Sequence, residues 1–437
     1  MHINHFIWDE LDGAARNRLR MRIRGDVFSI IERIQPIIGD VRFNGDAGLV
    51  AYALKHNEAE ITADQIQVSE DEFAYARDAL PNDVKEAIHA CAKNVKKFHE
   101  EQFRRIEQEW DVEIQSGMNV GERVTPVSSI GIYVPGGVHA YPSNVYMMCM
   151  PAIVAKVPEI IIVTPPLPDG SVDPAVLYAA EFCGVKKVYK ASGAQAIAAM
   201  AYGTPTVPKV AKILGEAGPF GSAAKMVLSH LVESGVMTEF SEVAILSDGS
   251  ADLQNLLLDM ICELEHGADS AGFLITHDAH TVDFIREHLP ACIDTLPMPQ
   301  REYAHQVMEK HGAIIQTSSL DQSIEVCNEI APGRLLVRGK QAKKVAAQIV
   351  NAGEVLVGEY TSSALSGYGI GLNHGLPTGG LAHSSSTTTI WDFLKRTHVA
   401  EVSKSACESL TQSASVLAKY EGFTAHLNAL TKRSRSV

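Results

Sequence analysis

The run Ser129-Ile-Gly-Ile-Tyr-Val-Pro-Gly-Gly137 decides the fold class of this 437-residue chain. Its β-branched and aromatic residues favour a short strand, and the proline and glycines end that strand in a turn. Beyond it we expect helices and strands in alternation: helix Met147–Lys156, strand Ile160–Thr164, helix Asp173–Cys183, strand Lys187–Lys190 and helix Gln195–Tyr202. Such alternation is typical of a parallel α/β sheet.

A second alternating set begins at the apolar run Val243–Leu246. It continues with expected helices Ala251–Leu264, Ala279–His288 and Leu320–Ile330, and with expected strands Gly272–Thr276, Gly312–Gln316 and Glu354–Val357. We therefore expect two Rossmann-like parallel sheets, whose ligands bind beyond the carboxyl ends of the strands. No G-x-G-x-x-G motif follows any of these strands, so the residues by themselves leave the cofactor undetermined.

The flanking segments read as helical. Apolar residues recur at helical spacing over Asp26–Ile38, Gly45–His56, Ser69–Ala79 and Pro81–Glu107, and again over Ile390–Lys395, Ser403–Tyr420 and Ala425–Thr431. The last set is too thin to fold alone and is expected to pack on a second subunit. We expect a helical segment over 1–28, a first α/β domain over 29–128 and 243–388, a second over 129–242, and a helical arm over 389–437.

Composition narrows the class of protein. The chain is 46% hydrophobic and 21% charged, with a formal net charge of −14. This acidic balance argues against nucleic acid or an anionic membrane as partner, because phosphate binding needs clustered lysine and arginine. No signal peptide or run long enough for a membrane helix is visible. Seven scattered cysteines without C-x-x-C spacing fit reduced thiols, so a cytoplasmic protein is expected.

Several motifs resemble the histidinol dehydrogenase family in order along nearly the whole chain. They are Ile132-Tyr-Val-Pro-Gly-Gly137, Gly193-Ala-Gln-Ala-Ile197, Glu265-His-Gly267, Gly371-Leu-Asn-His-Gly-Leu-Pro-Thr378, Phe393-Leu-Lys-Arg396 and Glu421-Gly-Phe-Thr-Ala-His426. The resemblance implies a domain-swapped homodimer that uses NAD and a bound zinc. It also implies oxidation of an amino alcohol to an amino acid in two hydride transfers.

The resemblance assigns ligand roles to individual residues. Tyr133 and Gln195 match positions that contact NAD, and Ser241 matches a serine that contacts substrate. The third cofactor motif departs, because Gly215-Glu-Ala-Gly218 stands where the family has Gly-Pro-Gly-Asn. The asparagine is lost and Glu216 adds a negative charge, so we expect NAD to bind more weakly or in a different pose.

The implied metal site is half intact. Glu263, His266 and His426 match ligand positions, the last contributed by the partner subunit, whereas Gly367 stands where the family has an aspartate. Glu263 and His266 are three apart on an expected helix, which places both on one face. A carboxylate suits zinc or another divalent metal. The alternative is a metal-free histidine that hydrogen-bonds to a neighbour.

The catalytic pair of the family is missing. Gly333 and Arg334 occupy the positions of a glutamate and a histidine that do the acid/base work, and arginine cannot take a proton at neutral pH. His374 and Glu421, which match residues near the substrate, are the remaining candidates for the proton acceptor. Arg334 could bind an anionic group of a substrate, or it could form a surface ion pair with one of the many acidic residues.

Three functional hypotheses follow. The leading one is an NAD-dependent alcohol dehydrogenase that oxidises a small-molecule alcohol other than histidinol once, with a metal polarising the alcohol oxygen. The second is a histidinol dehydrogenase with a rearranged base. The third is an inactive homologue that serves as a binding or regulatory protein. Neither the substrate, the direction of reaction nor the choice between NAD and NADP can be derived from the residues.

Overall fold

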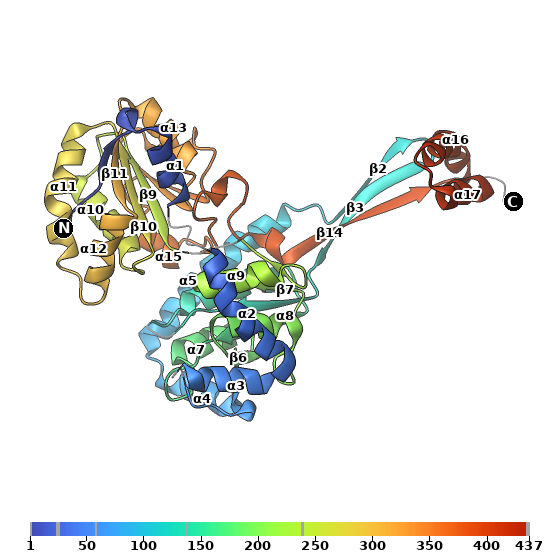
Figure 1. Ribbon diagram of the computed structural model, residues 1–437, viewed down its shortest axis with the longest axis horizontal. Helices are drawn as coiled ribbons and strands as arrows, with labels where there is room; N and C mark the ends of the chain where they lie inside the picture. Colours follow the sequence, from blue (N-terminus) through green and yellow to red (C-terminus); the bar gives the residue numbers. More distant parts are fainter. Residues whose placement is uncertain (1, 23–26, 57–58, 137–138, 237–239, 434–437) are drawn as a thin grey trace. The chain divides into compact units, whose positions relative to one another are not determined.

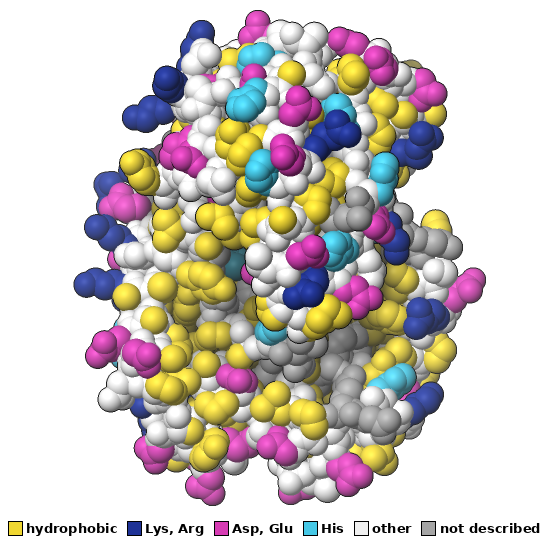
Figure 2. All heavy atoms as spheres, turned by 90° about the vertical axis from the view of Figure 1, so that its left-hand side faces the viewer, with side chains coloured by type: hydrophobic (Ala, Val, Ile, Leu, Met, Phe, Trp, Pro, Cys, Tyr) yellow, Lys and Arg dark blue, Asp and Glu magenta, His cyan; other side chains and the backbone are white. Residues whose placement is uncertain are grey.

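The computed structural model describes residues 2–22, 27–56, 59–136, 139–236 and 240–433. It divides into two compact units, one made of Met1–Glu101 with Val127–Phe393 and the other of Gln102–Pro126 with Leu394–Val437. Among the described residues, no helix has both the length and the apolar character that crossing a membrane needs. Acidic and basic side chains both occur across the face drawn in Figure 2.

The first unit holds a six-stranded parallel sheet in the order β1-β11-β10-β9-β12-β13 (Figure 1). Most of its strand residues are buried, which is the usual state of a parallel sheet that is covered on both faces. The strands are β1 (His5–Ile7), β9 (Glu242–Ser247), β10 (Ala271–Thr276), β11 (Ala313–Gln316), β12 (Arg334–Arg338) and β13 (Glu354–Val357).

Helices cover both faces of this sheet. Neighbouring residues of β10 point to opposite sides: Phe273 packs with Cys327 and Val345, whereas Leu274 packs with Met260 and Ile285. The helices involved are α1 (Gly13–Met21), α10 (Leu253–Leu264), α11 (Ala279–Ile293), α12 (Gln300–Lys310), α13 (Leu320–Ile330) and α14 (Ala342–Ala346). The sheet expected from the alternating set that begins at Val243 is therefore present. It contains two further strands, β1 and β12, that were not predicted from the sequence.

The first unit also holds a five-stranded parallel sheet in the order β6-β5-β4-β7-β8. Its strands are β4 (Ser129–Tyr133), β5 (Glu159–Thr164), β6 (Val188–Lys190), β7 (Lys212–Leu214) and β8 (Glu233–Ser234). Its helices are α6 (Pro142–Val154), α7 (Pro174–Phe182), α8 (Gly193–Tyr202) and α9 (Gly218–Leu228). The order reverses between β4 and β7, and such a switch point is where doubly wound sheets bind nucleotides.

The N-terminal helices pack with this second sheet. They are α2 (Val27–Asn44), α3 (Asp46–Lys55), α4 (Glu70–Ala79) and α5 (Asn82–Arg104). We expected residues 29–128 to fold with 243–388, but α2 contacts α8 and α9, and α4 contacts α7. The physical reason is that Ile34 and Val41 of α2 enter the same core as Ile197 and Ala224. The expected helical segment 1–28 likewise contains a strand, β1, which pairs with β11.

The second unit, taken by itself, is an antiparallel three-stranded sheet followed by two helices (Figure 1). The elements are β2 (Glu109–Gln115), β3 (Met118–Pro126), β14 (Leu394–Val402), α16 (Lys404–Tyr420) and α17 (Thr424–Arg433). We expected helices only. The strands have a period-two signal that was overlooked, since Trp110, Val112 and Ile114 alternate with acidic or polar residues in β2.

A helix ending sets the position of the first residue of β12. Helix α13 ends at Ile330 and is capped by Ala331, which adopts the left-handed conformation with φ of 50°. Pro332 then prevents the helix from continuing. The chain then enters β12 at Arg334, between Val243 of β9 and Glu354 of β13. Arg334 thereby lies at the amino edge of the first sheet.

Gly215, which follows β7 at the switch point, has no room for a side chain. Its φ is +101°, and a Cβ there would lie 2.0 Å from the carbonyl oxygen of Tyr133 at the end of β4. Gly184 has a similar positive φ of +75°, but a Cβ there would meet nothing within 4 Å. Both positions favour glycine because of their positive φ, but only Gly215 also lacks the space for a Cβ.

Gly215→Ala is expected to lower the free energy of unfolding by about 3 kcal/mol, because backbone overlap adds to the left-handed strain. Gly184→Ala is expected to cost only about 1 kcal/mol, from strain alone. Urea denaturation of both variants checks this. Equal losses would mean that β4 and β7 separate easily at this point.

Candidate active site

The candidate site is a cavity of about 140 Å³ in the first unit, lined by Ser241, Glu263 and Arg334 among others. It shares Tyr141, Ser143, Glu265, His266 and Tyr368 with a neighbouring cavity of about 510 Å³. The two cavities therefore adjoin and together offer space for a small molecule and part of a cofactor.

The cavity lies at the amino edge of the first sheet. Ser241 immediately precedes β9, Arg334 begins β12, and Glu263 lies in the last turn of α10. We expected ligands beyond the carboxyl ends of both sheets, and for the first sheet the cavity is at the opposite edge. The expectation holds for the second sheet, because Glu216, which also lines the cavity, follows the carboxyl end of β7.

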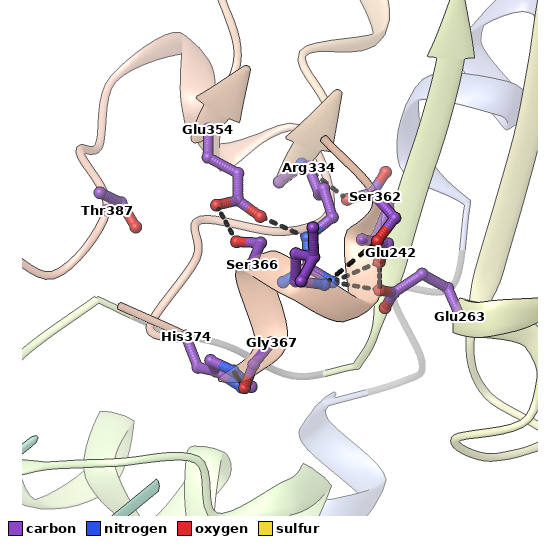
Figure 3. Close-up of polar contacts among 12 residues, drawn as sticks. Glu242, Glu263, Arg334, Glu354, Ser362, Ser366, Gly367, His374 and Thr387 are labelled. Carbon is purple, nitrogen blue, oxygen red and sulfur yellow. Dashed lines mark hydrogen bonds and ion pairs between the residues drawn. The ribbon is translucent and has the colours of Figure 1, made fainter. Parts of the chain in front are cut away.

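Arg334 is the centre of a buried polar cluster (Figure 3). Its Nε donates to Oε1 of Glu354 and its Nη1 donates to Oε1 of Glu263, in two ion pairs whose side chains are all less than a tenth exposed. Nη1 also lies 3.1 Å from the Ser363 hydroxyl, which itself donates to Glu263. Ser366 donates to Oε2 of Glu354 at 2.7 Å.

Glu263 and Arg334 stabilise each other's charged forms. Burial alone would favour the neutral acid at Glu263, but the charge of Arg334 outweighs it, so the pKa of Glu263 lies below its ordinary value. Burial also disfavours the charged guanidinium, yet the two carboxylates raise the pKa of Arg334 above its ordinary value. Arg334 is therefore a permanent cation that cannot accept a proton. It forms ion pairs with acidic residues, but these pairs are buried and not at the surface as the sequence alternative had it.

A second buried ion pair supports the chain around Gly333. Arg22 pairs with Oε1 of Glu242, and Oε2 of Glu242 accepts from the backbone nitrogens of Gly333 at 3.4 Å and Gly379 at 2.9 Å. A Cβ at Gly333 would lie 2.8 Å from the Cγ2 methyl of Thr378. A side chain at position 333, where the family resemblance places a glutamate, would therefore require Thr378 to shift.

His374 is oriented by a backbone carbonyl. Its Nε2 lies 2.6 Å from the carbonyl oxygen of Gly367 in helix α15 (Ser363–Tyr368), and because a carbonyl only accepts, Nε2 carries the proton. Burial, with the nearby charge of Arg334, lowers the pKa of His374 to about 4. This histidine is a neutral group at pH 7 and a weak base.

The metal ion that the resemblance implies does not fit the residues present. The carboxylate of Glu263 already accepts from Arg334 and Ser363, and the guanidinium would repel a second cation. Helix α10 ends at Leu264, so His266 lies just beyond it and not on one helix face with Glu263 as expected, although both residues line the cavity. Within the described residues, no group of three or more His, Cys, Asp and Glu side chains has metal-binding geometry.

The second sheet offers a better fit to a nucleotide. Tyr133 ends β4, and its hydroxyl accepts from the backbone nitrogen of Gly193 at 3.0 Å. Gln195 lies in the first turn of α8, where its Nε2 donates to Ser192 at 2.8 Å. Its Oε1 is buried without a hydrogen-bond partner among the described residues. An orphaned amide oxygen at a switch point suits a nucleotide hydroxyl, and both residues named from the sequence lie at this point.

Glu216 emerges as a candidate that the sequence reading treated only as an obstacle to NAD. It follows Gly215 at the switch point and lines the cavity with His266 and Arg334. Burial raises the pKa of Glu216 to about 7, although the charge of Arg334 acts to lower it. A carboxyl group with this pKa can exchange a proton at neutral pH. The neighbouring Lys225 is also buried, which lowers its pKa to about 8.

Two of the residues named from the sequence lie in the second unit. Glu421 follows α16 and His426 lies in α17, and both side chains are exposed. The ring of His426 lies 5.1 Å from that of Phe423. Their roles therefore remain a proposal. Glu354, Ser363 and Ser366 were not anticipated, and no motif in the sequence marked them as partners of Arg334.

The fold and the site define a class of protein: a doubly wound α/β scaffold with a nucleotide-type switch point beside a polar cavity. A family model described as histidinol dehydrogenase matches residues 21–434. A protein of Mesorhizobium japonicum described as histidinol dehydrogenase homolog 2 is 38% identical over 97% of this chain and 96% of its own. A histidinol dehydrogenase of Synechocystis is 37% identical over 95% of this chain and 96% of its own.

A solved structure agrees with these relatives. The crystal structure of histidinol dehydrogenase from Elizabethkingia anophelis has a TM-score of 0.89 at 29% identity, covering 99% of this chain and 98% of that one. The chain belongs to the histidinol dehydrogenase family.

Glu216→Gln is expected to change how stability depends on pH. The folded-state pKa of Glu216, about 7, lies above its ordinary value of 4.5. The native protein therefore binds more protons than the unfolded chain between these values, and this residue's contribution to stability falls as pH rises through that window. Glutamine stays neutral, so the melting temperature of the variant relative to the parent should rise by several degrees between pH 5 and pH 8.

Thermal denaturation across this pH range measures the difference. Glu265→Gln is the matched control, because Glu265 lines the same cavity but its side chain is exposed. A pH-independent difference for Glu216→Gln would contradict the raised pKa.

Proposed function

We propose that this chain is an NAD-dependent dehydrogenase that oxidises an alcohol other than histidinol to the carbonyl compound, in a single hydride transfer. One observation carries the proposal: positions 333 and 334 hold a glycine and an arginine fixed in two buried ion pairs. In the family reaction, the second oxidation requires water to be added to a bound aldehyde. Neither residue can activate that water, so the reaction would stop at the carbonyl stage.

The proton of the alcohol needs an acceptor, and we assign this role to Glu216. It lies in the cavity and at the switch point where the nicotinamide is expected, and its pKa of about 7 matches a base that works at neutral pH. His374, the first candidate from the sequence, has its Nε2 engaged by Gly367 and a pKa of about 4. We propose that His374 orients the substrate and that Glu421 contacts it from the partner subunit.

Tyr133 and Gln195 are proposed to hold the NAD. The orphaned Oε1 of Gln195 supports this, since a ribose hydroxyl would satisfy it. Ser241 lines the cavity and is proposed to contact the substrate. The sequence left open whether Arg334 holds an anionic group of the substrate. In the structure its Nε and Nη1 donate to Glu354 and Glu263, so the protein's own carboxylates already balance its charge. With Glu216, Glu263 and Glu265 on its walls, the cavity favours a neutral or cationic alcohol.

Turnover with NAD and a panel of neutral and amino alcohols tests this proposal. One NADH is expected per alcohol consumed, with the aldehyde or ketone accumulating, and kcat/KM is expected to rise with pH through about 7. Glu216→Gln should lower kcat by roughly 10²–10⁴-fold and remove this pH dependence. Full activity in Glu216→Gln would contradict the assigned base, and two NADH per alcohol would contradict the single oxidation.

A histidinol dehydrogenase with a rearranged base is the second candidate. The proximity of Glu216 to the cavity favours it, and so do relatives such as the Synechocystis protein, which carry the name histidinol dehydrogenase. Growth of a histidine auxotroph on expression of this chain would select this candidate over the first. A protein with no turnover and no thermal shift on adding NAD would instead be an inactive homologue with a binding role.

We further propose that the chain works as a homodimer through its second unit. Within that unit, every residue of β2 is exposed, and large apolar side chains on α16 and after it are exposed too: Val416, Leu417, Tyr420 and Phe423. A surface of this kind usually marks an interface.

Val416→Asp with Leu417→Asp is expected to convert the dimer to a monomer, because two charges would be buried in the interface. Light scattering after size-exclusion chromatography measures the mass. Lys419→Asp, on the same helix, is the control, since it changes charge without removing apolar surface. A monomeric parent protein would contradict the proposal at once.

A further inference from the structure

We propose that Arg334 takes the place of the divalent metal ion in this site, so that the chain carries its own fixed cation and binds no zinc. The family resemblance places a metal at Glu263 and His266, and the guanidinium of Arg334 lies on that same Glu263 carboxylate. The inference concerns the cation of the site and stands whichever alcohol the protein oxidises.

The contacts of Glu263 carry the first step. Its Oε1 accepts from Nη1 of Arg334 and from the hydroxyl of Ser363, so this oxygen already has a charged and a neutral donor. A metal ligand must offer a lone pair, and both donors compete for those of Oε1. A cation that approached Oε2 instead would be repelled by the guanidinium charge next to it. The ion pair is buried, with side-chain exposures of 7% for Arg334 and 5% for Glu263, so solvent does not weaken it.

The opposite side of the guanidinium is fixed as well. Nε of Arg334 donates to Glu354, its neighbour across β12 and β13, and Ser366 holds the other oxygen of Glu354 at 2.7 Å. A side chain held between two carboxylates cannot swing away to admit an ion. The guanidinium is therefore a fixed part of the site, and it supplies the positive charge that Glu263 would otherwise obtain from a metal.

A second position of the implied metal site also lacks its ligand, which agrees with a site that binds no metal. Gly367 stands where the resemblance implies an aspartate, and a Cβ there would lie 3.8 Å from Nε2 of His374, which is ordinary contact. The position is therefore sterically open to an aspartate, but the chain does not have one. The glycine at position 367 removes a negative charge and Arg334 adds a positive one. Both differences lower the affinity of the site for a metal cation.

The arginine retains a face for a ligand. Nε donates to Glu354 and Nη1 to Glu263 and Ser363, whereas Nη2 has no hydrogen bond to any described residue. Because Arg334 lines the cavity, these N–H groups are the donors left for a substrate oxygen. Unlike a metal ion, they cannot be removed by a chelator.

The deciding measurement is the metal content of the tag-free, full-length protein by elemental analysis, with melting temperatures in EDTA and in zinc chloride. We expect less than about one tenth of a zinc per chain and the same melting temperature in both. The thermal shift that NAD produces should also be unchanged by EDTA. About one zinc per chain, removed by EDTA with a loss of melting temperature, would overturn the proposal, and neither readout requires turnover.

Arg334→Met tests the replacement directly. It leaves the carboxylates of Glu263 and Glu354 uncovered, so the variant should melt at a lower temperature than the parent and regain part of the loss in zinc chloride. Arg334→Lys keeps the charge and should show no zinc response. If both variants fail to fold, the metal content of the parent protein still decides.

Arg338→Met is the matched control. Arg338 lies on the same strand, is fully buried, and pairs at 2.7 Å with Asp259, one turn before Glu263 on the same helix. Its loss should lower the melting temperature without recovery in zinc chloride. Equal recovery in Arg334→Met and Arg338→Met would overturn the assignment of the cation's place to Arg334.

Discussion

The site depends on the pairing of buried carboxylates with arginines at the amino edge of the first sheet. Glu263, Glu354 and Glu242 all lie there with little or no exposure. Arg334 pairs with the first two and Arg22 pairs with the third. Removing one partner of such a pair is far more destabilising than the pair is stabilising, because an isolated buried charge is left behind. This constraint ties together the start of β12, the end of α10 and the start of β13, and it fixes the wall of the cavity.

The same pairing explains why a dehydrogenase scaffold has lost its usual acid/base group without losing its cavity. A basic side chain at position 334 needs buried acids beside it, and Glu263 and Glu354 provide them from a neighbouring helix and strand. In the reaction we propose, Glu216 takes over the proton transfer. It lies at the switch point of the second sheet and lines the cavity, and burial raises its pKa to about 7.

Much of the fold could be predicted from the sequence. Short apolar runs between amphipathic segments gave both parallel sheets, since period and length are local properties of the chain. The family resemblance is confirmed by the comparisons. The partners of Arg334 could not be predicted, because Glu354 and Ser363 are brought to it by cross-strand register and by helix α15. The strands of the second unit were not predicted although Trp110, Val112 and Ile114 alternate with polar residues in β2, because every residue of this strand is exposed and no buried apolar run marks it. The packing of α2 against the second sheet could not be predicted either, because the spacing of its apolar residues predicts a helix but not which sheet the helix covers.

The contact between Gly333 and Thr378 has a consequence for engineering the site. With the Thr378 methyl 2.8 Å from where a Cβ would stand, any side chain introduced at position 333 has to displace Thr378 slightly. A glutamate placed there would also lie next to Arg334, whose charge is already shared by two buried carboxylates. Restoring acid/base chemistry at this edge of the sheet therefore calls for a coordinated change at positions 333 and 334 rather than for one substitution.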